Sequence, residues 1–245
     1  MNHDKAFEGF WRLADPKISL ASFAGMAMAA FFAAADNGLA PAWLILTVLG
    51  IFCIEVGKNA SGEVVDFDSG TDLGVAVEDR SPFSGGKRVL VDGLLSRGQC
   101  WLIAGTFFAL GIAIGLLIVV LREPRVLFLG LAGVALAWYY HGGTVRLAYR
   151  GLGELAVAIA YGPLVVCGTY LVQTAQFSLP LIYASASLGL LVAAFLCINE
   201  FPDYSADKAA GKRNLVVRLG RQASKSLYVA LVLAAYLLLG WAALW

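Results

Sequence analysis

Long apolar runs dominate this chain and decide what it can fold into. Seven stretches carry few or no charges, and they cover residues 18–36, 39–57, 99–121, 125–141, 152–173, 178–199 and 223–245. A helix needs about 20 apolar residues to cross the hydrocarbon core of a bilayer. Runs this long without alternation are helices rather than barrel strands. The sequence therefore predicts an all-α, polytopic membrane helical bundle with about seven transmembrane helices, formed by residues 1–245 as a single domain.

The composition agrees with this prediction and excludes other classes of protein. Charged residues make up 14% of the chain and hydrophobic residues 60%, whereas soluble domains have about 25% charged residues. The formal net charge is +1, so no global field attracts nucleic acid. The four cysteines are scattered through apolar stretches and the two histidines are far apart. Neither a disulfide framework nor a zinc site is expected.

Lysine and arginine are divided unequally between the two sides of the predicted bundle. If the N-terminus is cytoplasmic, Arg122 and Arg125 are the only cations of the 18 that lie on the opposite side. Cytoplasmic loops of membrane proteins carry an excess of Lys and Arg. We therefore expect an inner membrane of bacterial type, with the N-terminus and the two long polar loops in the cytoplasm.

An acidic stretch follows the second apolar run. Asn59, Glu63 and Asp66 recur at intervals of four and three residues, so they share one face if that helix continues past residue 57. Asp72 comes after Gly70, which permits a turn. The other acidic residues of this loop, Asp68 among them, are interpreted as solvated loop residues.

A second acidic stretch follows the sixth apolar run, on the same predicted side. Asn199, Asp203 and Asp207 recur at intervals of four residues, and Lys212 and Arg213 come shortly afterwards. Pro202 lies among the acids and is tolerated if the helix breaks or restarts there.

Carboxylates that share a helix face repel one another unless a cation lies among them. Mg²⁺ prefers oxygen ligands and is often held by one or two carboxylates together with substrate phosphate. Two such faces opposite each other would hold Mg²⁺ and a diphosphate. The candidate metal ligands are Asn59, Glu63, Asp66, Asp72, Asn199, Asp203 and Asp207. The candidate diphosphate-binding cations are Lys58, Lys212 and Arg213.

The two motifs resemble those of the UbiA superfamily of intramembrane aromatic prenyltransferases. The first motif of that family usually runs Asn-Asp-x-x-Asp with a later Asp, and here Gly62-Glu63 replace the Asn-Asp ahead of Asp66. The second motif, Asp-x-x-x-Asp with a later Lys, matches Asp203, Asp207 and Lys212. The resemblance implies that Asp66, Asp203, Asp207 and Lys212 are catalytic. The family fold has nine helices, so the two C-terminal helices are expected to be missing from these 245 residues.

Two further stretches, from Leu147 to Thr174 and from Gly211 to Gly220, resemble the dihydroxynaphthoate polyprenyltransferase branch, often called MenA. The resemblance implies Mg²⁺-dependent transfer of a polyprenyl group from an allylic diphosphate to an aromatic acceptor, a dihydroxynaphthoate in menaquinone biosynthesis. It leaves prenyl chain length and oligomeric state undefined. The candidate acceptor-binding residues are Arg146, Tyr149, Arg150 and Glu154. The two arginines lie one turn apart and share a face if the fifth helix begins early enough.

Other interpretations of the sequence remain open. 4-Hydroxybenzoate or another phenol is an alternative acceptor. A divalent-cation transporter is an alternative of another class, because intramembrane carboxylates mark ion pathways. Against a transporter, no acidic residue lies in the middle of a predicted span. The segment from Ser81 to Val89 contains Gly-Gly-Lys, but it lacks the spacing and the preceding strand of a nucleotide-binding loop.

Overall fold

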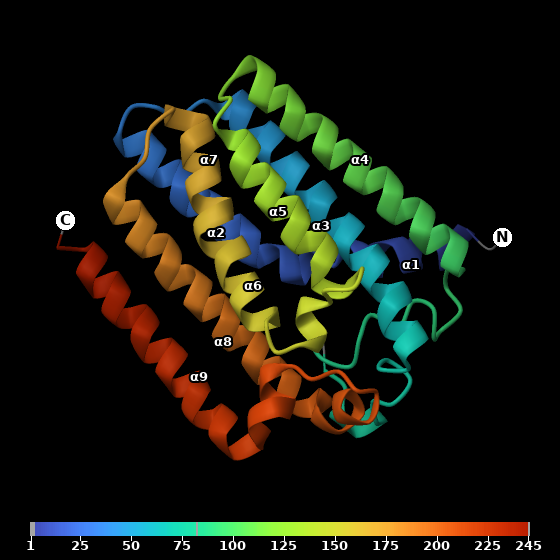
Figure 1. The fold of residues 1–245 in the computed structure, drawn as a ribbon. Helices are drawn as coiled ribbons and strands as arrows, with labels where there is room; N and C mark the ends of the chain where they lie inside the picture. The colour runs from blue at the N-terminus through green and yellow to red at the C-terminus, as the bar shows by residue number, and fades with distance from the viewer. Residues whose placement is uncertain (1–2, 82, 245) are drawn as a thin grey trace.

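The computed structural model describes residues 3–81 and 83–244 and shows a bundle of helices (Figure 1). In chain order the α-helices are α1 (His3–Ala14), α2 (Pro16–Ala35), α3 (Pro41–Ser69), α4 (Arg97–Leu121), α5 (Val126–His141), α6 (Gly153–Ile159), α7 (Val165–Thr174), α8 (Leu179–Ala209) and α9 (Leu215–Ala242). A π-helical turn, Ala160–Leu164, joins α6 to α7. Short 3₁₀ turns lie at Val77–Asp79 and Leu147–Tyr149.

The helices bear out the prediction of a polytopic membrane bundle. Within the described residues, six helical segments are long and apolar enough to cross a bilayer, and the 16-residue α5 is a shorter apolar helix. The second and sixth apolar runs continue further than their hydrophobic parts, to Ser69 and Ala209 respectively. Both acidic stretches are therefore helical over most of their length. Pro202 lies within the continuous helix α8.

The arrangement of the helices brings the two acidic stretches to one end of the bundle. Helices α4 and α9 lie at opposite edges, with α3 packed on α4 and α8 packed on α9 (Figure 1). The C-terminal ends of α3 and α8 both point toward the end where the long loop 70–96 and the short loop 210–214 lie. Sequence segments about 130 residues apart therefore meet there.

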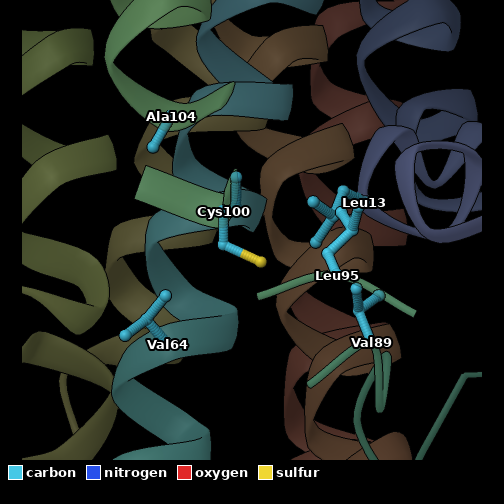
Figure 2. Packing of buried hydrophobic residues seen from close by; sticks show 7 residues of the cluster. Leu13, Val64, Val89, Leu95, Cys100 and Ala104 are labelled. Atoms are coloured by element: carbon cyan, nitrogen blue, oxygen red, sulfur yellow. The ribbon is translucent and has the colours of Figure 1, made fainter. Parts of the chain in front are cut away.

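A buried hydrophobic cluster fixes the long loop to the bundle. Val89 and Leu95 of the loop pack with Leu13 of α1, Val64 of α3 and Cys100 of α4 (Figure 2). Leu13 and Val89 are fully buried. Because these side chains would otherwise be in water, their burial holds the loop against the polar end of α3.

Two glycines permit an unusually close approach between α8 and the π-helical turn. A Cβ atom added to Gly189 would lie 2.2 Å from the carbonyl oxygen of Ala158, and one added to Gly162 would lie 2.5 Å from that of Ser185. The turn contains Pro163, which has no backbone N–H to donate. The backbones of α6, the turn and α8 are therefore in direct contact, as small residues allow in membrane helices.

We expect Gly189→Ala to destabilise the fold, because the new methyl group would overlap a backbone carbonyl. Overpacking of this kind costs about 1–3 kcal/mol, so the thermal unfolding temperature in detergent should fall by several degrees. Gly115→Ala in α4 is the matched control, because nothing lies within 4 Å of its added Cβ. Equal unfolding temperatures for the two variants would contradict the close contact.

Candidate active site

A polar cavity of about 580 Å³ opens between α3, α8 and the long loop. All the candidate metal ligands contribute to its lining: Asn59, Glu63, Asp66, Asp72, Asn199, Asp203 and Asp207. The continuation of α3 and α8 as helices explains this convergence, because residues three and four positions apart share a helix face. The two acidic stretches face the same space, as their spacing indicates.

Lys212 lies between the two acidic helices. Its Nζ is 4.0 Å from Asp66 Oδ2 on α3 and 3.7 Å from Asp207 Oδ1 on α8. Burial lowers the pKa of the Lys212 ammonium, but the charges of Asp66 and Asp207 outweigh this effect and raise it well above its usual value. Lys212 is therefore a permanent cation at the meeting point of the two motifs.

Each of these two aspartates has a further polar partner. The Tyr149 hydroxyl donates to Asp66 Oδ1 at 2.7 Å. Burial and the neighbouring charge of Asp66 raise the pKa of Tyr149 to about 12, so its hydroxyl stays protonated. Asn214 caps α9 with its side-chain oxygen and donates through Nδ2 to Asp207 Oδ2 at 2.8 Å. The carboxylates are held in position while Asp207 Oδ1 keeps no hydrogen-bond partner.

Asn59 and Glu63 also hold neighbouring segments in place. Asn59 Nδ2 donates to the carbonyl oxygen of Leu13 at 3.0 Å. Glu63 Oε1 accepts the backbone N–H of Leu90 at 2.8 Å. Both side chains are buried, so these bonds tie α1 and the long loop to α3. Both residues also belong to the lining of the cavity.

The Gly-Gly-Lys segment, excluded as a nucleotide-binding loop, lies at the cavity. The Gly85 N–H donates to both carboxylate oxygens of Asp203, at 2.9 and 3.1 Å. Gly86 has φ +73° and lies against the Asp72 carboxylate, since a Cβ there would be 2.3 Å from Oδ1. Burial, reinforced by the charges of Asp66 and Glu63, raises the pKa of Asp72 to about 8. The loop therefore touches one aspartate from each motif.

The candidate diphosphate-binding cations are placed differently from one another. Lys58 and Lys212 line the cavity, whereas Arg213 is exposed and lies outside its lining. Lys58 Nζ lies 5.1 Å from the centre of the Tyr140 ring. Lys87 also lines the cavity and forms an ion pair with Asp15 at 2.6 Å.

The predicted acceptor-binding arginines do not share a helix face. Helix α6 begins only at Gly153, because Arg146 has a positive φ of 44° and Gly151 one of 71°. Arg146 and Arg150 are exposed and do not line the cavity. Glu154 is buried and accepts the backbone N–H of Leu215 at 3.0 Å. The condition for a shared face, an earlier start of the fifth helix, is therefore not met, while the role of both arginines in acceptor binding stays a prediction.

An apolar groove of about 310 Å³ adjoins the polar cavity and runs along α3, α4, α5 and α7. Four residues line both spaces: Lys58, Tyr140, Val157 and Tyr161. Glu55 lies in the groove near this junction, where its Oε2 accepts the Ser19 hydroxyl at 2.8 Å and its Oε1 has no partner. A polar chamber thus opens directly into an apolar one.

Three functional candidates were not singled out from the sequence: Glu55, Lys87 and His141. The paired glycines before Lys87 are a signal that could have indicated a backbone shaped around a ligand. Glu55 lies eight residues before Glu63, and a longer helix would have placed it on nearly the same face. Nothing in the local sequence connects His141 to motifs about 70 residues away.

The donor set fits a hard divalent cation. Carboxylate and amide oxygens from two helices face one cavity, and two buried aspartate oxygens in its lining, Asp15 Oδ1 and Asp207 Oδ1, lack a hydrogen-bond partner. Within the described residues, no three Asp, Glu, His or Cys side chains are close enough together to hold a metal ion by themselves. Oxygens of a phosphate-bearing ligand or of water would have to complete the coordination.

Comparison with known proteins settles the family. A model described as the UbiA prenyltransferase family matches residues 23–245. This chain belongs to the UbiA prenyltransferase family. The prediction from the two acidic motifs is therefore confirmed.

Several curated UbiA-family relatives bear names that refer to naphthoate. A 1,4-dihydroxy-2-naphthoate octaprenyltransferase of Mycobacterium tuberculosis is 31% identical over 79% of this chain and 64% of its own length. A 2-carboxy-1,4-naphthoquinone phytyltransferase of Synechocystis is 32% identical over 78% of this chain and 59% of its own length. The 1,4-dihydroxy-2-naphthoate octaprenyltransferase of Bacillus subtilis is 26% identical over 93% of this chain and 71% of its own length. The chain thus spans less than two thirds of the first two relatives.

Solved structures show the same UbiA fold. A UbiA homolog from Archaeoglobus fulgidus bound to GPP and Mg²⁺ superposes with a TM-score of 0.73, over 96% of this chain and 77% of that one. The same homolog bound to DMAPP and Mg²⁺ superposes with a TM-score of 0.66. Sequence identity is 18% in both comparisons, so they establish the fold.

Gly86→Ala should impair binding of a diphosphate, because the added methyl group would displace Asp72. Gly93→Ala is the matched control: its φ is also positive (64°), but nothing lies within 4 Å of its added Cβ. Both changes should cost about 1 kcal/mol of stability through backbone strain. Only Gly86→Ala should weaken binding of a prenyl diphosphate with Mg²⁺ in calorimetry. Equal affinities for the two variants would exclude a role for the Gly86–Asp72 contact.

Proposed function

We propose that this UbiA-family protein transfers a prenyl group from an allylic diphosphate to an aromatic acceptor. One observation carries the proposal: the polar cavity between the two acidic motifs opens into an apolar groove through shared lining residues. An allylic prenyl diphosphate has the same division, with a charged head and a long hydrocarbon tail. The head matches the cavity and the tail matches the groove.

The names of the relatives support a finer proposal, that the acceptor is a dihydroxynaphthoate. Three named octaprenyltransferases and one phytyltransferase refer to a naphthoate or naphthoquinone. The Archaeoglobus homolog, which has the same fold, was solved with GPP or DMAPP and Mg²⁺. Together they support a polyprenyl diphosphate donor, Mg²⁺ as cofactor and a place in menaquinone biosynthesis.

The residues of the cavity supply the interactions that the donor needs. Asp66, Asp72, Asp203 and Asp207 would hold Mg²⁺, with Asn59, Glu63 and Asn199 completing the polar walls. When bound, Mg²⁺ withdraws electron density from the diphosphate and makes it a better leaving group. Lys212 and Lys58 bring positive charge to the diphosphate oxygens, and Tyr149 keeps Asp66 oriented by its hydrogen bond.

The reaction breaks the allylic C–O bond, and the electron pair leaves with the diphosphate. The resulting allylic cation lies at the junction of the two spaces, where the faces of Tyr140 and Tyr161 can stabilise it. A ring carbon of the acceptor then forms the new C–C bond. For a naphthoate the acceptor carboxylate is lost as CO₂, which restores the aromatic ring.

Water must be excluded from this cation, because hydrolysis would compete with prenylation. The apolar groove provides a dry wall on one side. The long loop, fixed by Val89 and Leu95, contributes a further part of the cavity wall. We propose that this end of the bundle faces the cytoplasm of a bacterial-type inner membrane, because almost all lysines and arginines lie on that side of the spans.

The direct test is an assay of the purified protein in detergent with geranyl diphosphate, Mg²⁺ and a panel of acceptors. Pyrophosphate release and a prenylated product are expected with 1,4-dihydroxy-2-naphthoate. If a product forms only with 4-hydroxybenzoate or another phenol, the proposal of prenyl transfer stands and the proposal of a naphthoate acceptor is wrong. Absence of product with every acceptor and donor would contradict the proposal.

Asp66→Asn and Asp203→Asn should each lower turnover by at least about a thousandfold, because a charge that stabilises the departing diphosphate is lost. Both proteins should remain monodisperse and helical. Asp68→Asn is the control, since Asp68 is exposed at the end of the same helix and pairs with Arg97. Substantial Mg²⁺-dependent turnover in either site variant would refute the assignment.

Lys212→Ala should weaken binding of the prenyl diphosphate about ten- to a hundredfold, as expected for a charge-assisted contact of about 1.5–3 kcal/mol. Acceptor binding should change much less. Arg213→Ala is the matched control, because this neighbouring cation lies outside the cavity. Steady-state kinetics with each substrate varied in turn separates the two effects. A change confined to the acceptor KM would place Lys212 elsewhere in the mechanism.

A further inference from the structure

The imidazole ring of His141 on α5 packs directly against Gly62 on α3. A Cβ atom added to Gly62 would lie 2.6 Å from His141 Nδ1 and 2.8 Å from Cε1. The imidazole therefore fills the space that any side chain at position 62 would need. Position 62 lies one helical turn before Asp66. The motif that this segment resembles has an asparagine at position 62. This chain has no side chain at that position, and the His141 ring fills the space.

The ring is directed at the metal-binding region rather than at solvent or lipid. His141 lines the polar cavity, and its side chain is 14% exposed. It packs edge-on against Tyr140 with ring centres 4.6 Å apart. Its Nδ1 is buried without a hydrogen-bond partner. Nδ1 is the nitrogen that lies against Gly62, and Nε2 is the one that faces Asp66.

The distance to Asp66 is that of two ligands rather than of a hydrogen bond. His141 Nε2 lies 3.6 Å from Asp66 Oδ2, beyond the usual limit of about 3.2 Å for an N–H···O bond. Two ligands that each bind one cation at about 2.1 Å are roughly 3–4 Å apart. The pair can therefore share a divalent cation without large movement.

We propose that His141 supplies a nitrogen ligand to the divalent cation held by Asp66, in place of a side chain from position 62. The proposal rests on the metal-dependent function proposed above. An imidazole nitrogen suits transition metals better than it suits Mg²⁺. The site should accordingly bind Mn²⁺ or Co²⁺ more tightly, relative to Mg²⁺, than a site made of oxygen ligands alone.

Pulsed electron paramagnetic resonance tests the ligand directly. The probe is Mn²⁺ with inorganic pyrophosphate, added to the purified 245-residue protein whose affinity tag has been removed. A ¹⁴N coupling to Mn²⁺ is expected in the wild type. It should vanish in His141→Ala, and Mn²⁺ affinity should fall on the order of tenfold or more. The chain has two histidines, so His3→Ala is the control that must keep the signal.

A pair of substitutions separates coordination from packing. Gly62→Asn alone should displace the ring and abolish the nitrogen coupling. Gly62→Asn combined with His141→Ala should regain most of the Mn²⁺ affinity through the amide oxygen, without a histidine signal, and should shift metal preference toward Mg²⁺. If the double variant binds no better than His141→Ala, replacement of one ligand by the other is contradicted.

The outcomes distinguish this inference from the proposed function. Tight Mn²⁺–pyrophosphate binding without nitrogen coupling in the wild type would overturn the role of His141 and leave prenyl transfer intact. A lowered unfolding temperature in His141→Ala with an unchanged spectrum would likewise assign the ring to packing alone. Absence of Mn²⁺ binding in every variant would overturn both the inference and the metal-dependent function.

Discussion

The buried ion group of Asp66, Lys212 and Asp207 is the interaction on which the polar end of this bundle depends. Removing a carboxylate from water costs several kcal/mol unless a countercharge compensates. Asp66 and Asp207 come from different helices, and the Lys212 ammonium lies within 4.0 Å of both. The group therefore holds two mutually repelling helix ends together across a cavity. It also leaves a strongly charged space that fits a diphosphate bound together with divalent cations.

The long loop makes sense as part of the same electrostatic arrangement. Backbone N–H groups reach carboxylates at two points, from Gly85 to Asp203 and from Leu90 to Glu63. Such bonds stabilise the acids without adding a mobile side chain, and positive φ at Gly85 and Gly86 lets the backbone approach closely. Hydrophobic burial of Val89 then fixes the loop. One segment thus orders the acids and forms part of the cavity wall.

Helical periodicity explains how much could be predicted from the sequence. The spacing of Asn59, Glu63 and Asp66 predicted that these residues share one helix face. They do line the cavity together, because α3 continues to Ser69. The contacts of Gly85 and His141 could not be predicted in this way. They join segments separated by about 80 residues or more, and only the packing of α5 and the loop brings them together. The backbone near residue 150 could not be predicted either, and the role of Arg146 and Arg150 stays a prediction. Positive φ at Arg146 and Gly151 interrupts a local pattern that reads as helical.

The shape of the two spaces also bears on the alternative of a cation transporter. Glu55 is near the middle of the extended helix α3, but it lies near the end of the apolar run 39–57. The groove beyond Glu55 decides the matter in another way. Its walls are almost entirely aliphatic, with residues such as Ile54, Leu127 and Val165, and Thr47 and Thr169 add only hydroxyls. A divalent cation leaving the carboxylates would lose its ligands and gain none, at a cost of many kcal/mol. A hydrocarbon tail gains free energy along the same surface, about 0.8 kcal/mol for each buried CH₂. The groove therefore favours an occupant that is charged at one end and apolar along the rest.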